Sequence, residues 1–311
     1  MKITMRIPME VDDQREFQNI AAVTAMAQAM DNAGIDACHI TDHPAPTAKW
    51  RAAGGHDALD PFTGLAFVAA VTRRLKLHTN LVVLPYRNPF VTAKAAATLD
   101  VLSEGRLILG VGVGYLRGEY EALGVDFETR GALMDEAIDT LKMAWCEGEA
   151  SCQGRAFAAR GVLARPLPIQ KPHPPIWAGG NSHRAIRRAA ERCDGWSPFF
   201  VEGAMSKGVR TDEIVSLEDL ETKVGQLQEH RLAAGRPWPL DICIAPKVPL
   251  QPGSHADAQR WLDDLSELAE LGVTWTGCDL PHPNFAAYMD NLQWFAEEVV
   301  PEIHKLPASR T

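Results

Sequence analysis

Apolar runs and amphipathic stretches alternate along the chain. The first apolar run, residues 2–7, is followed by apolar positions at helical spacing over residues 19–33, and this stretch ends at Gly34. Glycine favours the left-handed conformation that closes a helix, so the pattern predicts one strand followed by one helix. Continued along the chain, it predicts strands at residues 2–7, 37–41, 75–84, 107–113, 175–178, 195–197, 241–248 and 273–276, and helices at residues 19–33, 61–72, 89–102, 130–147, 182–192, 217–227 and 256–271.

Eight strand signals that alternate with helices predict a closed (β/α)8 TIM barrel of the α/β class. Parallel neighbours need a crossover helix, and closure removes both exposed sheet edges. The alternative is an open, doubly wound sheet. Barrels of this length commonly form one domain, so residues 1–311 are expected to form a single unit. Two long stretches, residues 43–59 and 152–174, are expected to be loop insertions over the carboxyl-terminal face of the barrel.

The composition is that of an ordinary globular enzyme, with 46% hydrophobic and 23% charged residues. A formal charge of -9 at pH 7 argues against a surface that tracks nucleic-acid phosphates. No apolar stretch approaches the roughly 18 residues of a membrane span, and the amino terminus lacks an export signal. The six cysteines include no Cys-x-x-Cys pair, so reduced thiols are expected. These features predict a cytoplasmic protein with no nucleic-acid or membrane partner.

In such a barrel the reactive groups lie where the strands end. The second predicted strand ends in Asp42-His43, and a carboxylate beside an imidazole can hold and tune a group that moves protons near neutral pH. The alternative is a capping aspartate beside a surface histidine. The third strand carries His78-Thr79-Asn80 within an apolar run. Those residues mark either a bulge that turns backbone toward a ligand or an inward polar layer.

Glycines follow the fourth and fifth predicted strands. The fourth runs through Gly112 and Gly114 to Tyr115, and its spacing favours a strand that lines a cofactor plane over a dinucleotide-binding turn. The fifth leads into residues 179–183 and then a helix, an arrangement in which free backbone N–H groups hold a phosphate. The alternative there is an ordinary capped turn. Zincin, α/β-hydrolase and P-loop motifs are missing from the sequence, which removes the main support for those classes. No His-x-His pair lies on any predicted strand, so we expect no catalytic metal.

Together these residues resemble the luciferase-like monooxygenase superfamily, in particular its coenzyme F-420-dependent oxidoreductases. The likeness extends over almost the whole chain. It is strongest in the segments Gly34-Ile35-Asp36, Thr41-Asp42-His43, Asn88–Val91, Ala97–Asp100, Leu102–Arg106, Leu109–Gly114, Pro174–Asn181 and Asp194-Gly195-Trp196.

The resemblance implies an oxidoreductase that transfers a hydride between coenzyme F-420 and a small organic substrate. It assigns proton transfer to His43 and a hydrogen bond with the polar part of the ring to Asp42. It places a non-proline cis peptide bond at Asn80-Leu81, behind the ring. The further cofactor contacts that it implies are Gly112, Val113 and Gly114 beside the ring, and Gly179, Gly180, Asn181 and Ser182 at the phosphate.

Tyr115 departs from the pattern of the family's sugar-phosphate dehydrogenases, which carry an acidic residue just after these glycines. With Trp50 and His56, it is a candidate for substrate contact, because aromatic walls suit flat ligands. Two alternatives stay open: an FMN-dependent monooxygenase that receives reduced flavin from a separate reductase, and a flavin-binding relative without activity. The resemblance also implies a homodimer.

Overall fold

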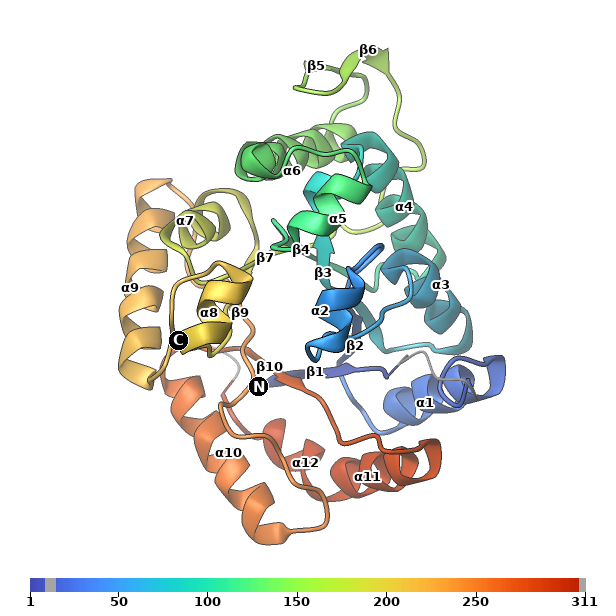
Figure 1. Ribbon diagram of the computed structural model, residues 1–311, viewed down its shortest axis with the longest axis vertical. Helices are drawn as coiled ribbons and strands as arrows, with labels where there is room; N and C mark the ends of the chain where they lie inside the picture. The colour runs from blue at the N-terminus through green and yellow to red at the C-terminus, as the bar shows by residue number, and fades with distance from the viewer. Residues whose placement is uncertain (9–14, 308–311) are drawn as a thin grey trace.

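The computed structural model describes residues 1–8 and 15–307, and eight parallel strands form its central sheet (Figure 1). The strands are β1 (Lys2–Arg6), β2 (Ala37–Ile40), β3 (Lys76–Val83), β4 (Leu107–Gly112), β7 (Ile176–Gly179), β8 (Gly195–Ser197), β9 (Asp241–Ile242) and β10 (Trp275–Cys278), hydrogen-bonded in the order β10-β1-β2-β3-β4-β7-β8-β9. The two end strands meet as well, because Cys243 bridges Trp275 in parallel and the Thr274 N–H donates to the Ile242 carbonyl over 3.0 Å. The closed (β/α)8 barrel is confirmed, and the open sheet is wrong.

One long helix follows each of the eight barrel strands and lies in the outer ring of Figure 1. These helices are α1 (Ile20–Asn32), α3 (Pro61–Val71), α4 (Pro89–Leu102), α6 (Arg130–Cys146), α7 (His183–Arg192), α9 (Leu217–Ala233), α10 (His255–Glu270) and α11 (Phe285–Glu298). Side chains cap the first turns of α3 and α4, since Asp60 accepts from the Thr63 N–H and Asn88 from the Phe90 N–H, each over 2.9 Å. Across residues 1–8 and 15–307, no helix combines the length and apolar character that a bilayer span requires.

Short elements occupy the connections that leave the carboxyl ends of the strands. Helix α2 (Ala48–Ala52) lies in the first long insertion, α5 (Arg117–Ala122) follows β4, and α8 (Gly203–Val209) follows β8. In the view down the barrel these three lie within the ring of long helices (Figure 1). The remaining short helices are η1 (Leu84–Tyr86), η2 (Phe127–Thr129) and α12 (Val300–Ile303). Helices α2, α5 and α8 therefore gather on the face where a barrel carries its active site.

The pattern predicts neither helix α11 nor the short helices, and the structure differs from it in two further regions. The seventh barrel strand ends at Ile242 rather than Val248, and the rest of the predicted run contains Pro246, which has no N–H for a ladder. Residues 152–174 are not only loop. They include most of a hairpin of β5 (Ala150–Gln153) and β6 (Ala158–Val162), which projects beyond α6 at the top of Figure 1.

Candidate active site

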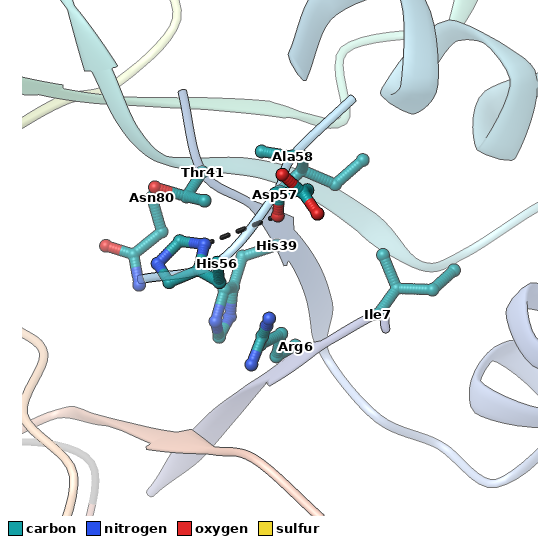
Figure 2. A pocket seen from close by; sticks show the side chains of 9 residues that line it. Arg6, Ile7, His39, Thr41, His56, Asp57, Ala58 and Asn80 are labelled. Carbon is teal, nitrogen blue, oxygen red and sulfur yellow. Dashed lines mark hydrogen bonds between the residues drawn. The ribbon is translucent and has the colours of Figure 1, made fainter. Parts of the chain in front are cut away.

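A cavity of ≈190 Å³ opens at the carboxyl ends of β1 and β2. Figure 2 shows its wall, which is mainly polar. The polar side chains that line the cavity are Arg6, His39, Thr41, His56, Asp57 and Asn80. Arg6 pairs with Asp279 over 2.8 Å, which balances its charge. Two of the predicted site residues, His56 and Asn80, therefore face one cavity.

Two histidines inside the barrel share one threonine beside this cavity. Thr4 Oγ1 lies 3.1 Å from Nδ1 of His39 and 3.3 Å from Nδ1 of His78. Burial, with a smaller contribution from Arg6, lowers the pKa of His39 to about 3. Burial also lowers the pKa of His78, with a smaller contribution from His39. Both rings are neutral at neutral pH, and His78 belongs to an inward polar layer of the barrel.

The third strand also carries an irregularity at its polar residues. The register of its pairing with β4 shifts between Thr79 and Val82, and the Asn80-Leu81 peptide bond is cis. The cis bond lies where the family resemblance places it. Asn80 itself lines the cavity. The bulge and the inward polar layer, posed as alternatives by the sequence, are therefore both present in this strand.

Leu81 occupies the space left by two of the predicted cofactor-binding glycines. A Cβ atom added to Gly112 would lie 3.0 Å from Leu81 Cδ1, and one added to Gly179 would lie 2.2 Å from the same atom. Within the chain, these glycines make room for Leu81. Gly114 has a different reason to be glycine, since its φ of +65° lies in the left-handed region. Contact of Gly112, Val113, Gly114 and Gly179 with a cofactor stays a prediction.

Asp42 is buried, and both of its carboxylate oxygens have partners. The Val83 N–H donates to Oδ2 and Arg87 Nη2 donates to Oδ1, each over 3.0 Å. Burial raises the pKa of Asp42, and Arg87 opposes that rise. Arg87 also donates to Asp60 over 2.9 Å. Asp42 therefore ties the end of β2 to the end of β3, and its hydrogen bond to a cofactor ring stays a prediction.

His43 lies among three aromatic rings. Its ring centroid is 4.7 Å from that of Trp50, 5.0 Å from that of His56 and 6.2 Å from that of Tyr115. Trp50 and His56 come from the first long insertion, and Tyr115 comes from the connection after β4. The structure thus brings the three predicted substrate contacts together around the predicted proton-transfer residue. Such an enclosure limits water at the imidazole while leaving it next to the cavity that His56 lines.

Glu119 is a buried acidic residue that the sequence pattern does not single out. Its Oε1 lies 3.4 Å from His43 Nδ1, and the Tyr86 hydroxyl donates to its Oε2 over 2.8 Å. Burial, and next the hydrogen bond to Glu119, raises the pKa of Tyr86, so the hydroxyl keeps its proton. Glu121, two residues further along the same helix, is exposed. No local feature of the sequence separates these two glutamates.

The loop after β7 is organised by Asn181, which is fully buried. Its Nδ2 donates to the Phe199 and Asp212 carbonyls over 2.8 and 3.1 Å, and its Oδ1 accepts from the Phe199 N–H over 3.1 Å. Ser182 caps α7 by accepting from the Ala185 N–H over 3.3 Å. The Gly180 N–H donates to the Ser197 carbonyl over 3.2 Å and the Asn181 N–H donates to Thr211 Oγ1 over 2.9 Å. An anion at this loop would therefore depend on the first N–H groups of α7, which have no partner within the helix.

Comparison with known proteins finds relatives that are named as flavin-dependent or F-420-dependent enzymes. The model of the luciferase-like monooxygenase family matches residues 1–214. The oxygenase component of a flavin-dependent trigonelline monooxygenase from Acinetobacter baylyi is 33% identical over 160 residues, which cover 48% of this chain and 44% of that protein. An F-420-dependent glucose-6-phosphate dehydrogenase from Gordonia bronchialis is 28% identical over 352 aligned positions, which cover 98% of both chains.

A solved structure gives the same fold at lower identity. The monooxygenase RslO1 from Streptomyces bottropensis superposes with a TM-score of 0.76 at 19% identity, over 97% of this chain and 99% of that one. At that level of identity the likeness establishes the barrel alone.

Proposed function

Because the chain belongs to the luciferase-like monooxygenase family, we propose that it is an oxidoreductase that transfers a hydride between coenzyme F-420 and a small organic substrate. The observation that carries this proposal is the enclosure of His43 by Trp50, His56 and Tyr115 next to a polar cavity of ≈190 Å³. The Gordonia bronchialis relative, named as F-420-dependent, aligns over nearly the whole chain.

Residues at the strand ends fit a planar, phosphorylated ring. Among the residues that the structure describes, Ser197 Oγ is a buried polar atom near this face that lacks a hydrogen-bond partner. Ser197 is the register partner of Gly179 across β7 and β8, so its residue adjoins the loop that we assign to the phosphate. When bound, a deazaflavin supplies a two-electron carrier. The residues that would hold it are Asp42, Asn80, Leu81, Gly112, Val113, Gly114, Gly179, Gly180, Asn181 and Ser182.

The chain itself supplies proton transfer, positioning and exclusion of water. His43 exchanges the proton that accompanies hydride transfer, and a positioned acid or base contributes about 10²- to 10⁴-fold. Asp42 contributes indirectly, because it fixes the ends of β2 and β3 through Val83 and Arg87. The rings around His43 hold a small substrate beside the imidazole and displace water from it.

The cofactor can be tested directly. Purified protein is titrated with reduced F-420 and, separately, with reduced FMN under anaerobic conditions, and the ring absorbance and fluorescence are followed. We expect saturable binding of reduced F-420. Tight binding of reduced FMN with oxygen consumption on exposure to air, and no binding of F-420, would overturn the deazaflavin assignment.

The second candidate is an FMN-dependent monooxygenase that receives reduced flavin from a separate reductase. It is favoured by the similarity to the trigonelline monooxygenase oxygenase component, although the match spans less than half of that protein. The same barrel face serves either ring, so the cofactor titration distinguishes the two candidates. A homodimer, a cytoplasmic location and a single domain over residues 1–311 stay predictions.

A further inference from the structure

The histidine at the end of β2 is paired with a carboxylate from another element of the barrel. Glu119, in α5, is 1% exposed as a side chain and His43 is 8% exposed, and their nearest atoms, Oε1 and Nδ1, are 3.4 Å apart. Among the described residues, Nδ1 has no hydrogen-bond partner, so the two groups lie at ion-pair distance without a formed hydrogen bond. Such bonds are often long in a ligand-free site and shorten when it fills.

The other partners of Glu119 define its protonation. The Tyr86 hydroxyl donates to Oε2 over 2.8 Å, and the Ala45 N–H donates to Oε1 over 3.4 Å. Both oxygens therefore face donors, which suits an ionised carboxylate that only accepts. The third group beside this carboxylate is the His43 imidazole, near Oε1, and it too must donate. The proton on the imidazole of His43 then belongs on Nδ1, and Nε2 is left as the basic nitrogen.

Asp42 does not fill this role, although it precedes His43 in the sequence. Its two oxygens are engaged by Val83 and Arg87, and Arg87 compensates its charge. Within the described part of the chain, the other titratable groups beside the ring of His43 are His56 and Tyr115, both at ring-contact distance. Burial raises the pKa of Tyr115, so that side chain is neutral near pH 7. Glu119 is therefore the negative group that acts on the imidazole.

We propose that Glu119 is the positioning residue for His43, holding the proton on Nδ1 so that Nε2 exchanges a proton with the substrate. The proton exchange between Nε2 and the substrate rests on the proposed function, whereas the pairing of Glu119 with His43 does not. When a substrate hydroxyl gives up its proton, the O–H bond breaks, Nε2 gains the proton, and the ring becomes a cation. That charge is balanced by the Glu119 carboxylate, which stays ionised. The reverse step returns the proton from Nε2 to oxygen.

The pairing can be tested on cofactor-free protein by nitrogen-15 NMR of the imidazole side chains. His43→Asn identifies the His43 signals by their loss. In the wild-type protein we expect the Nδ1–H tautomer at high pH. In Glu119→Gln the His43 protonation midpoint should lie at a lower pH than in the wild type, because an adjacent negative charge favours the protonated ring. An Nε2–H tautomer in the wild type, or an unchanged midpoint in Glu119→Gln, overturns the proposal.

Two further variants separate positioning from loss of stability. Tyr86→Phe keeps the Glu119 charge but removes its O–H donor, so it should leave the Nδ1–H tautomer in place and move the midpoint less than Glu119→Gln. Asp100→Asn is the matched control: Asp100 is also a fully buried carboxylate, and it accepts from the Ile169 and Gln170 N–H groups far from His43 in sequence. We expect it to lower the melting temperature without changing the His43 titration. A midpoint that moves equally in Asp100→Asn would show a general effect of destabilisation and refute the pairing.

Activity gives the second readout. With reduced F-420 bound, Glu119→Gln should lower kcat by about tenfold or more and move the pH profile of kcat in the direction of the NMR midpoint, with KM little changed. If no cofactor binds, the proposed function fails while the NMR result still decides the pairing. If the cofactor turns over and kcat and its pH profile are unchanged in Glu119→Gln, the positioning role fails alone.

Discussion

Gly110 lies in β4 against the third strand, where an added methyl group has no space. A Cβ atom at this position would lie 2.0 Å from the carbonyl oxygen of Thr79 and 2.8 Å from Nε2 of His78. Carbon and oxygen atoms normally stay about 3.3 Å apart or more, so Gly110→Ala must push two neighbouring strands apart by about 1 Å. The displacement also strains the hydrogen bond from the Thr79 hydroxyl to the Gly110 carbonyl, which is 2.7 Å long.

The expected loss follows from these two effects. Overpacking of a core costs about 1 to 3 kcal/mol, and a buried hydrogen bond contributes about 1 kcal/mol. We therefore expect Gly110→Ala to lower the free energy of unfolding by about 3 kcal/mol. With an unfolding entropy of about 2 cal/mol/K per residue over 311 residues, this loss corresponds to a fall in Tm of about 5 °C.

The assay is urea unfolding followed by tryptophan fluorescence, with Gly225→Ala as the matched control. Gly225 lies within α9, and a Cβ there would meet nothing within 4 Å. Alanine favours a helix over glycine by about 0.5 to 1 kcal/mol, so the control should be as stable as the wild type or more so. A Gly110→Ala protein with wild-type stability would refute the steric argument. Equal losses in both variants would refute it too.

Three further predictions test the site and its frame. His43→Ala should bind the reduced cofactor as the wild type does but lose about 10²- to 10⁴-fold in kcat. Unchanged behaviour of this variant would instead support the alternative of a flavin-binding relative without activity. Gly179→Ala and Leu81→Ala should each destabilise the protein, yet their combination should cost about 0.5 to 3 kcal/mol less than the sum in a urea double-mutant cycle, since the smaller side chain vacates the space that the methyl group needs. Burial acts to raise the pKa of Asp31, but three backbone N–H donors outweigh it and lower that pKa. The stability that Asp31 contributes should therefore be present above the unfolded pKa of about 3.9 and disappear as the pH falls through the lower folded value. The difference in urea stability between wild type and Asp31→Asn should accordingly shrink toward pH 2, and a constant difference would contradict this.

The order of the strands and helices, and the caps of two helices, could be predicted from short-range patterns in the sequence. The capping roles of Asp60 and Asn88 depend on N–H groups two or three residues away, so the sequence shows both partners at once. The order of strands and helices depends on local periodicity, and it identifies the barrel. The likeness to a known family located the cis bond at Asn80-Leu81, which the strand's own residues indicated only as a bulge or a polar layer.

The contacts within the site depended on which strands lie side by side in the sheet. From the sequence, Asp42 is expected to be the partner of its neighbour His43. In the structure the Asp42 carboxylate accepts from Arg87, 45 residues away, and the carboxylate near His43 comes from Glu119 in α5. Likewise the glycines after β4 and β7 indicated space for a ligand, and Leu81 takes part of that space. Periodicity states which face of an element is buried. It does not state which side chain from another element will meet it, because that depends on register and on how the strands close, and these are set by the packing of the whole chain.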